Sequence, residues 1–306
     1  MCAAPGGGDA PAANLSGMRR SDFLALAGAA TAAPTASQPP FAQPSDADPF
    51  VALEKHGGGR LGVVARNLGS AERLAHRGAE AFPLGGLWRL PLVMAVLARV
   101  DAGDNRLDRQ VAFGPSDLEP GSTLDRRYST GGILTLGRLC AYAISYGDDS
   151  AADLLAPLVG GPAAVTAYLR SIGIRGVRVD RLARERPPRA DPHDVRDTAT
   201  PDSMAHLLEQ VGSESPLSDD STALLLDWMR TNANGRGRLR AGVPADWSVA
   251  DVSGGAANAV NDAGLLTPPG SPIAIACFTL DFDGQGDANA AIAACARTVA
   301  ARFAGA

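Results

Sequence analysis

Lysine is almost absent from this sequence. Of its 28 basic residues only Lys55 is a lysine, and the others are arginines. Together with the high alanine and glycine content, this skew is typical of high-GC bacterial coding. It also restricts the chemistry, because an arginine stays protonated in proteins and cannot act as a general base. A reaction that needs a neutral amine has a single side chain available.

Other features of the composition exclude whole classes of function. The net charge of −5 leaves no basic excess for a nucleic-acid partner, and aromatic residues at 5% are too few for a base-stacking platform. No apolar run reaches the roughly 20 residues that a membrane span needs. We therefore expect a protein without a membrane span that acts as a monomer on a small molecule.

The sequence also lacks a recognisable metal-binding pattern. Its four cysteines and four histidines show neither zinc-ligand spacing nor a His-x-His pair, which predicts no metal and no cofactor. Three of the cysteines, Cys140, Cys277 and Cys295, lie in apolar surroundings and are expected to be buried. The segment Asp191-Pro192-His193-Asp194 is interpreted as a surface turn rather than as a catalytic His–Asp unit.

The first 48 residues differ from the remainder of the chain. Residues 18–36 carry paired arginines, a short weakly apolar stretch and small residues, as in a twin-arginine export signal. The alternatives are a disordered tail, a true start at Met18 and a cytoplasmic protein. Residues 34–48 are rich in proline, alanine and serine and predict a linker, so the folded domain is placed at 49–306.

Within that domain, strand patterns occupy both ends and helical patterns the middle. Strands are expected at 60–68, 247–252, 263–266 and 273–282, with 72–82 as a hairpin partner of the first. Helices are expected at 87–100, with a kink at Pro91, in two stretches of 133–156, and at 162–172, 201–211, 223–231 and 288–303. This order predicts an α/β (α+β) fold with an antiparallel sheet flanked by helices (49–84 and 243–306) plus an all-helical subdomain (85–242). A pocket is expected where the two parts meet.

Six stretches within residues 49–306 resemble the class A serine β-lactamases, in the same order and spacing. They are residues 82–84, 97–104, 160–166, 196–201, 227–230 and 238–242. The resemblance implies the fold described above and identifies the chain as a divergent member of that family.

The catalytic positions that the resemblance implies hold other residues. The family's Ser-x-x-Lys corresponds to Gly86-Leu87-Trp88-Arg89, which has neither nucleophile nor base, and no Ser-x-x-Lys exists elsewhere. The family's Ser-Asp-Asn corresponds to Gly147-Asp148-Asp149, and its Lys-Thr-Gly to Val252-Ser253-Gly254. The omega-loop glutamate corresponds to Ala183, with Glu185 two residues further on.

Several residues are nevertheless expected to form a binding site. Arg89 and Asp149 are predicted to make a bidentate ion pair on the pocket floor, as either a structural pair or a ligand contact. Ser253 adds a hydroxyl, and the backbone N–H groups of Gly86 and Gly255 are expected to form an oxyanion hole. The remaining pocket-lining candidates are Trp88, Phe113, Gly121, Tyr146, Gly147, Asp148, Ala183, Val252 and Gly254.

These substitutions predict a wider, drier pocket without a cation for an anionic β-lactam. From this we expect a non-hydrolytic enzyme that cyclises, adds to or isomerises a bulky, weakly charged metabolite of secondary metabolism. One alternative is a binding protein (a sensor, carrier or immunity factor). The other is residual β-lactamase or hydrolase activity.

Overall fold

The computed structural model describes residues 48–70 and 72–303. The signal-like segment at 18–36, Cys2 and nearly all of the expected linker lie outside the described residues. Among the described residues no single helix is long and apolar enough to cross a membrane, and the helices α5 (Asp149–Val159) and α6 (Pro162–Ser171) pass that test only as a pair bent by 69°.

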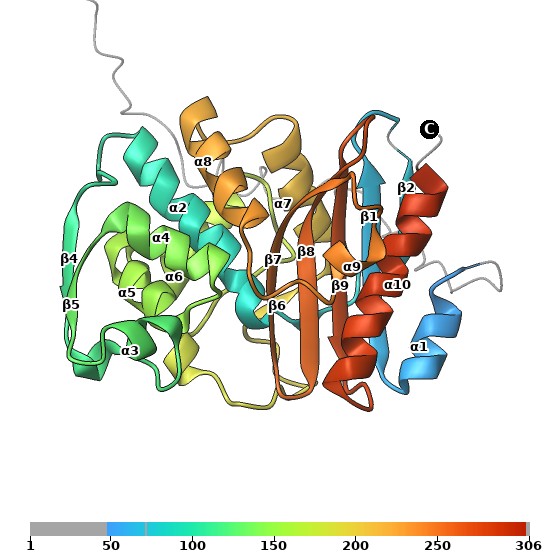
Figure 1. Ribbon diagram of the computed structural model, residues 1–306, viewed down its shortest axis with the longest axis horizontal. Coiled ribbons are helices and arrows are strands. Elements are labelled where there is room, and N and C mark those ends of the chain that lie inside the picture. The colour runs from blue at the N-terminus through green and yellow to red at the C-terminus, as the bar shows by residue number, and fades with distance from the viewer. Residues whose placement is uncertain (1–47, 71, 304–306) are drawn as a thin grey trace, which may run out of the picture. The chain divides into compact units, whose positions relative to one another are not determined.

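A five-stranded antiparallel sheet occupies one side of the domain in Figure 1, with strand order β2-β1-β9-β8-β7. Its strands are β1 (Arg60–Asn67), β2 (Arg73–His76), β7 (Ser248–Ala256), β8 (Ala259–Thr267) and β9 (Ile273–Leu280). The strands β8 and β9 are buried almost throughout, which matches the nearly unbroken apolar sequence of β9, whereas β8 also buries Asn261 and Asp262. The antiparallel sheet flanked by helices is therefore confirmed.

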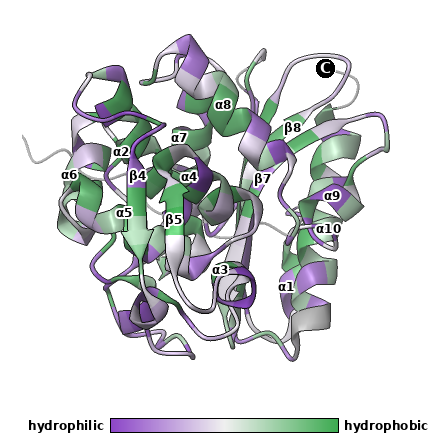
Figure 2. Ribbon diagram, turned by 60° about the vertical axis from the view of Figure 1, so that its left-hand side comes forward, coloured by the Kyte–Doolittle hydropathy of each residue, from purple (hydrophilic) through white to green (hydrophobic). Residues whose placement is uncertain are grey.

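Helices cover both faces of this sheet. The elements α1 (Val51–Gly57), α9 (Leu239–Gly242) and α10 (Gln285–Phe303) enclose one hydrophobic cluster against one face. On the other face α7 (Pro201–Gly212) packs against β1, β8 and β9, and α8 (Asp219–Arg230) packs against β7. Figure 2 shows both hydrophobic and hydrophilic residues along α8, as expected for a helix with one buried side.

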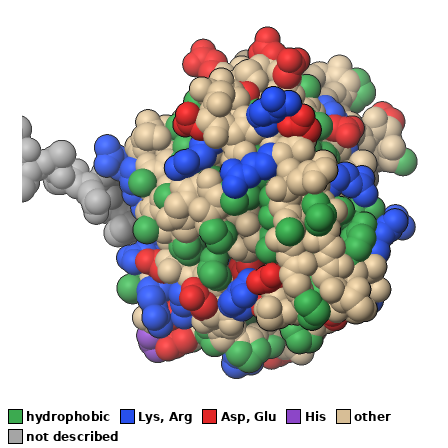
Figure 3. Space-filling model, turned by 90° about the vertical axis from the view of Figure 1, so that its left-hand side faces the viewer, with side chains coloured by type: hydrophobic (Ala, Val, Ile, Leu, Met, Phe, Trp, Pro, Cys, Tyr) green, Lys and Arg blue, Asp and Glu red, His purple; other side chains and the backbone are tan. Residues whose placement is uncertain are grey.

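The helical block is built around α2 (Arg89–Asp101), whose residues 89–97 are all buried. Around it lie α3 (Thr123–Arg127), α4 (Leu136–Ser145), α5 (Asp149–Val159) and α6 (Pro162–Ser171). Short elements complete the domain: β3 (Phe82–Pro83) with β6 (Thr198–Ala199), β4 (Gln110–Phe113) with β5 (Gly132–Thr135), and the 3-10 turns η2 (Gly85–Trp88), η3 (Pro115–Asp117) and η4 (Ala183–Glu185). The face at the β4–β5 end mixes acidic, basic and hydrophobic side chains (Figure 3).

Several expected elements differ from the structure in their bounds, residues 133–135 form a strand instead of a helix, and two further differences have a clear physical cause. Pro91 does not kink a helix: α2 begins at Arg89, so Pro91 lies in its first turn, where backbone N–H groups have no helical partner to lose. The hairpin partner of β1 is also shorter than 72–82, because β2 ends at His76 and Arg77 adopts a positive φ of 46°.

A buried cluster of charges joins α1 to β2. The imidazole of His76 contacts Asp48 through Nδ1 and Glu54 through Nε2, both at 2.8 Å. Arg77 donates two hydrogen bonds to Glu54. Burial opposes ionisation of Glu54, but the hydrogen bonds from Arg77 and His76 outweigh it and lower its pKa to about 2.

This cluster predicts an acid-sensitive contribution to stability. Since the folded-state pKa of Glu54 is depressed, the stabilisation is fully present above pH 4.5 and is lost as the pH falls toward 2. We expect Glu54→Gln to reduce the free energy of unfolding at pH 7 by about 1–3 kcal/mol, and by much less at pH 2.5, as measured by urea unfolding. Asp108→Asn, which removes an exposed ion pair with Arg106, is the control and should change little. A loss of equal size at both pH values would show that Glu54 does not act through its charge.

Candidate active site

Two adjoining cavities lie where the sheet edge meets the helical block. The first has a volume of about 220 Å³ and runs along the segment from Asp180 to Asp197, here called the Ω loop. The second is about 410 Å³ and lies between β7 and the segment around Tyr146. They share Arg89, Gly255 and Ala256, so they form one continuous site.

The guanidinium of Arg89 occupies the centre of this site. A Cβ atom placed on Gly86 would lie 2.2 Å from Nη1 of Arg89, deep inside van der Waals contact. A Cβ atom on Gly147, which has a φ of +60°, would lie 3.4 Å from the same nitrogen and 2.6 Å from Asn234 Nδ2. Glycine at 86 therefore leaves room for the Arg89 guanidinium and glycine at 147 for the Asn234 amide, so the space is filled rather than widened.

Arg89 is held by one carboxylate and two carbonyl groups. Its Nη2 donates to Asp149 Oδ1 at 2.6 Å, and its Nη1 donates to the carbonyl oxygens of Gly86 (3.2 Å) and Ser253 (3.4 Å). The pair with Asp149 thus has one hydrogen bond and not the two that were expected, because Nη1 is turned toward the backbone. The Arg89 side chain is 7% exposed and that of Asp149 is 44% exposed. The cation of the pair is therefore buried, and the carboxylate is accessible from the cavity.

The two glycines expected to form an oxyanion hole are brought together. Gly86 lies in η2 and Gly255 in β7, and both line the first cavity. The turn packs tightly against the strand, since a Cβ atom on Gly254 would lie 2.3 Å from Gly86 Cα. This close approach brings two glycines from separate elements to one cavity, and their backbone N–H groups remain the candidates for an oxyanion hole.

The Ω loop is fixed by buried charges. Asp180 and Asp197 close its ends, because each carboxylate accepts a hydrogen bond from the other residue's backbone N–H. Asp153, with a fully buried side chain, accepts from the backbone N–H groups of Ala183 (2.7 Å) and Arg184 (3.1 Å). Ala183 lines the first cavity, whereas Glu185 accepts from the backbone of Leu182 and is not among the lining residues.

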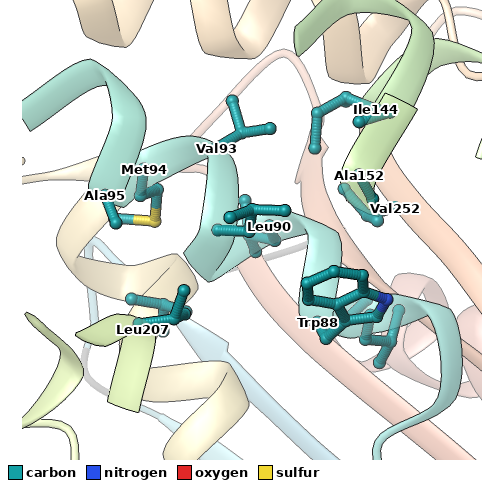
Figure 4. Close-up of a cluster of buried hydrophobic side chains, with 14 of the residues drawn as sticks. Trp88, Leu90, Val93, Met94, Ala95, Ile144, Ala152, Leu207 and Val252 are labelled. Atoms are coloured by element: carbon teal, nitrogen blue, oxygen red, sulfur yellow. The ribbon is translucent and has the colours of Figure 1, made fainter. Parts of the chain in front are cut away.

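The other predicted pocket residues separate into two groups. Tyr146, Gly147 and Gly254 line the second cavity as expected. The rest lie elsewhere: Trp88 and Val252 in the buried cluster of Figure 4, Phe113 in the core against Tyr128, Asp148 as the buried N-cap of α5, and Gly121 in an exposed turn before α3. In the 191–194 segment, Asp191 and Asp194 line the first cavity, and Asp191 accepts from the backbone of His193 as in a turn.

Two arginines that the sequence did not single out lie in the site. Arg186 stacks on Trp88, 4.5 Å from the ring centroid, and donates to the carbonyl of Gly85 at 3.0 Å. Burial lowers the pKa of Arg186 to about 10. Arg238 lines the second cavity and donates to the carbonyls of Gly254 and Asn261. In a sequence whose cations are nearly all arginine, no local pattern distinguishes these two.

The site is therefore charged rather than dry. Arginine and aspartate side chains line the first cavity: Arg89, Arg181, Arg186, Arg196, Asp149, Asp191, Asp194 and Asp197. Arg238 supplies a cation beside the second cavity even though position 252 is a valine. Residues 48–70 and 72–303 contain no cluster of three metal-ligating side chains.

Comparison with known proteins decides the family. The sequence model of the β-lactamase enzyme family matches residues 48–303. The chain belongs to the class A β-lactamase family. The carbapenem-hydrolyzing β-lactamase KPC of Klebsiella oxytoca is 38% identical over 236 residues, which cover 76% of this chain and 80% of that protein.

Solved structures of class A β-lactamases agree with this assignment. An ancestral (GNCA) class A β-lactamase is 41% identical with a TM-score of 0.79, and the match covers 83% of this chain and 98% of that one. A β-lactamase from Xanthomonas campestris is 34% identical with a TM-score of 0.78, covering 82% and 94%.

These relatives contradict the expected function. Proteins that are 38–41% identical over most of the chain are named β-lactamases, which opposes both a cyclising or isomerising enzyme and a binding protein without activity. They point instead to the third alternative, β-lactamase activity. The physical premise of the expectation was also wrong, because the pocket was taken to be wide, dry and without a cation.

Proposed function

We propose that this β-lactamase hydrolyses β-lactams with water, rather than a serine hydroxyl, as the group that attacks the carbonyl. The observation that carries the proposal is the position of the Arg89 guanidinium, which lies where a side chain on Gly86 would stand. We infer that Gly86, Arg89, Gly147, Ala183 and Val252 occupy the positions of the family's catalytic side chains. The site then keeps the family's substrate pocket but has no serine at the attacking position.

The residues present support a direct hydrolysis. The N–H groups of Gly86 and Gly255 would receive the carbonyl oxygen of the lactam and stabilise the negative charge that develops on it. The Asp149 carboxylate would take a proton from a water molecule as its oxygen bonds to the carbonyl carbon. The C–N bond of the ring then breaks and the nitrogen takes a proton. Arg89 orients Asp149 and cannot itself accept a proton.

The expected rate is modest. Serine hydrolases stripped of their catalytic side chains retain roughly 10³-fold catalysis over the reaction in water, which comes from the oxyanion hole and substrate binding. A chain with the same backbone donors and a carboxylate base should reach about this level. No covalent intermediate is expected, since no hydroxyl or thiol is placed at Gly86.

Incubation of the full chain with a chromogenic cephalosporin and with a penicillin tests the proposal. We expect slow, enzyme-dependent ring opening, and an intact mass that is unchanged throughout. Asp149→Asn should lower the rate at least about tenfold, and Asp108→Asn, an exposed carboxylate far from the cavities, is the matched control. A stable acyl adduct, or a complete lack of ring opening, would overturn the proposal.

A further inference from the structure

Three buried polar side chains meet behind the wall of the second cavity. Ser253, which lines that cavity on β7, is only 4% exposed. Its hydroxyl lies 3.1 Å from Asp262 Oδ1 on β8 and 3.4 Å from Asp251 Oδ2 on β7. Both aspartates are fully buried. A hydroxyl on the cavity wall is therefore in contact with two carboxyl groups that no ligand reaches.

The two carboxyl groups differ in their partners. Asp251 forms an ion pair with Arg240 at 2.5 Å and accepts a hydrogen bond from Asn232 Nδ2 at 3.0 Å. Asp262 has no ion pair within the described residues, and besides Ser253 it contacts the backbone N–H of Leu239 at 3.2 Å. Burial raises the pKa of Asp251 too, but its ion pair with Arg240 favours the ionised form, so Asp262 is the carboxyl of the two that more readily holds a proton. Burial, followed by the neighbouring Asp251 carboxylate, raises the pKa of Asp262 well above its usual range.

The hydrogen bonds around the Ser253 hydroxyl limit the direction in which a proton can move. The Ser253 oxygen has two lone pairs, and Asn232 Nδ2 donates to one of them at 2.9 Å. The hydroxyl donates to Asp262 Oδ1 at 3.1 Å while that carboxyl is ionised, and a proton on Asp262 would reverse this hydrogen bond and occupy the second lone pair. The hydrogen of Ser253 is then left with the longest contact, 3.4 Å to Asp251, or with a group in the cavity.

We propose that Ser253 donates the proton that the ring nitrogen takes when the C–N bond breaks, and that the Asp262 carboxyl returns a proton to Ser253. The proposal rests on the hydrolysis proposed above. Gly147, which lines the same cavity, has no side chain that could donate this proton. The proton that Asp149 takes from the attacking water returns through solvent and Ser253 to Asp262, so each turnover consumes one water and leaves the protein unchanged.

The groups that face Asp262 set its proton affinity. They are Asp251 on β7, Arg238 before α9, and the Cys277 thiol, which lies opposite Asp262 on β9. Arg240 in α9 acts through its ion pair with Asp251. Burial and the Asp251 carboxylate favour protonation and raise the pKa of Asp262, whereas Arg238 and the hydrogen bonds from the Leu239 backbone and the Ser253 hydroxyl oppose it. Ionisation of Asp262 would remove the proton source, so the rate of ring opening should fall on the alkaline side of the pH profile.

Kinetics and infrared spectroscopy of the full chain test the relay together. We expect Ser253→Ala to lower kcat about tenfold or more, with KM changed much less, and Ser253→Thr to recover most of the rate because it restores a hydroxyl. Ser248→Ala, at the exposed start of the same strand, is the control. In the infrared spectrum at pH 7 we expect the carbonyl band of a buried protonated carboxyl, which Asp262→Asn removes.

Each outcome is decisive. The tenfold loss together with the band at Asp262 supports the relay. The relay is overturned if Ser253→Ala opens the ring at the wild-type rate, or if the wild-type spectrum shows an ionised Asp262. Either result leaves the proposed hydrolysis standing. A wild-type chain that opens no β-lactam overturns both.

Discussion

Gly86→Ser alone should give no covalent adduct with a penicillin, whereas Gly86→Ser combined with Arg89→Lys should give one with the mass of the intact drug. In the single variant the new Cβ would lie 2.2 Å from Nη1 of Arg89, so the serine and the guanidinium compete for one place. Replacement by lysine removes the planar guanidinium and supplies an amine that can lose its proton. The pair also restores the Ser-x-x-Lys spacing at the start of α2, in which the amine reaches the hydroxyl.

The adduct of the double variant should persist. Ala183 lies on the Ω loop beside the first cavity and has no carboxylate, and the Arg89→Lys change removes the hydrogen bond that orients Asp149, so neither position activates a water against the ester. Intact mass spectrometry at increasing times after mixing measures both formation and decay. Arg89→Lys alone is the control and should stay unmodified. An adduct in Gly86→Ser alone would show that Arg89 does not block the nucleophile, and a double variant that never reacts would show that further positions are required.

The fold could be predicted from the sequence because its signals are local. The nearly continuous apolar run of β9 and the long buried stretch of α2 mark the sheet and the central helix directly, whereas only the 263–266 part of β8 was expected, because Asn261 and Asp262 interrupt its apolar pattern. The order of the elements along the chain then limits the arrangement to a sheet with a helical block. The kink expected at Pro91 was wrong because the helix begins two residues earlier, and only the exact start decides whether a proline strains it.

The interior of the site could not be predicted in the same way. The sequence places glycine at 86 and 147 but does not show which side chain enters the space they leave. Counting small residues therefore suggested a wide, apolar pocket, whereas the structure fills the space at Gly86 with Arg89 and the space at Gly147 with Asn234. Arg186 and Arg238 reach the site from segments far away in sequence, and in a chain with so many arginines only the three-dimensional arrangement distinguishes them. Phe113 was expected to line the pocket but is buried in the core. The sequence does not distinguish the two places, since an aromatic side chain packs equally well in either.

Arg238 should determine the affinity for substrates that carry a carboxylate. Position 252 has no cation, and Arg238 lines the second cavity with its guanidinium anchored by Asn289 at 2.8 Å and by the Asn261 carbonyl at 2.9 Å. Its Nη2 has no hydrogen-bond partner within residues 48–70 and 72–303. A charge-assisted hydrogen bond contributes about 1.5–3 kcal/mol, so Arg238→Ala should raise KM for a penicillin by roughly 10- to 100-fold.

The methyl ester of the same penicillin separates recognition from structure. Because the ester carries no negative charge, its KM, or its Kd measured by calorimetry, should change less than about threefold in Arg238→Ala. Arg236→Ala is the matched control, since Arg236 is an exposed arginine two residues away. If the acid and the ester lost affinity equally, Arg238 would act by holding the β7–β8 hairpin in place, and the anion would be bound by another arginine of the site. A loss confined to the acid would assign the carboxylate to Arg238 and orient the ring carbonyl toward Gly86 and Gly255.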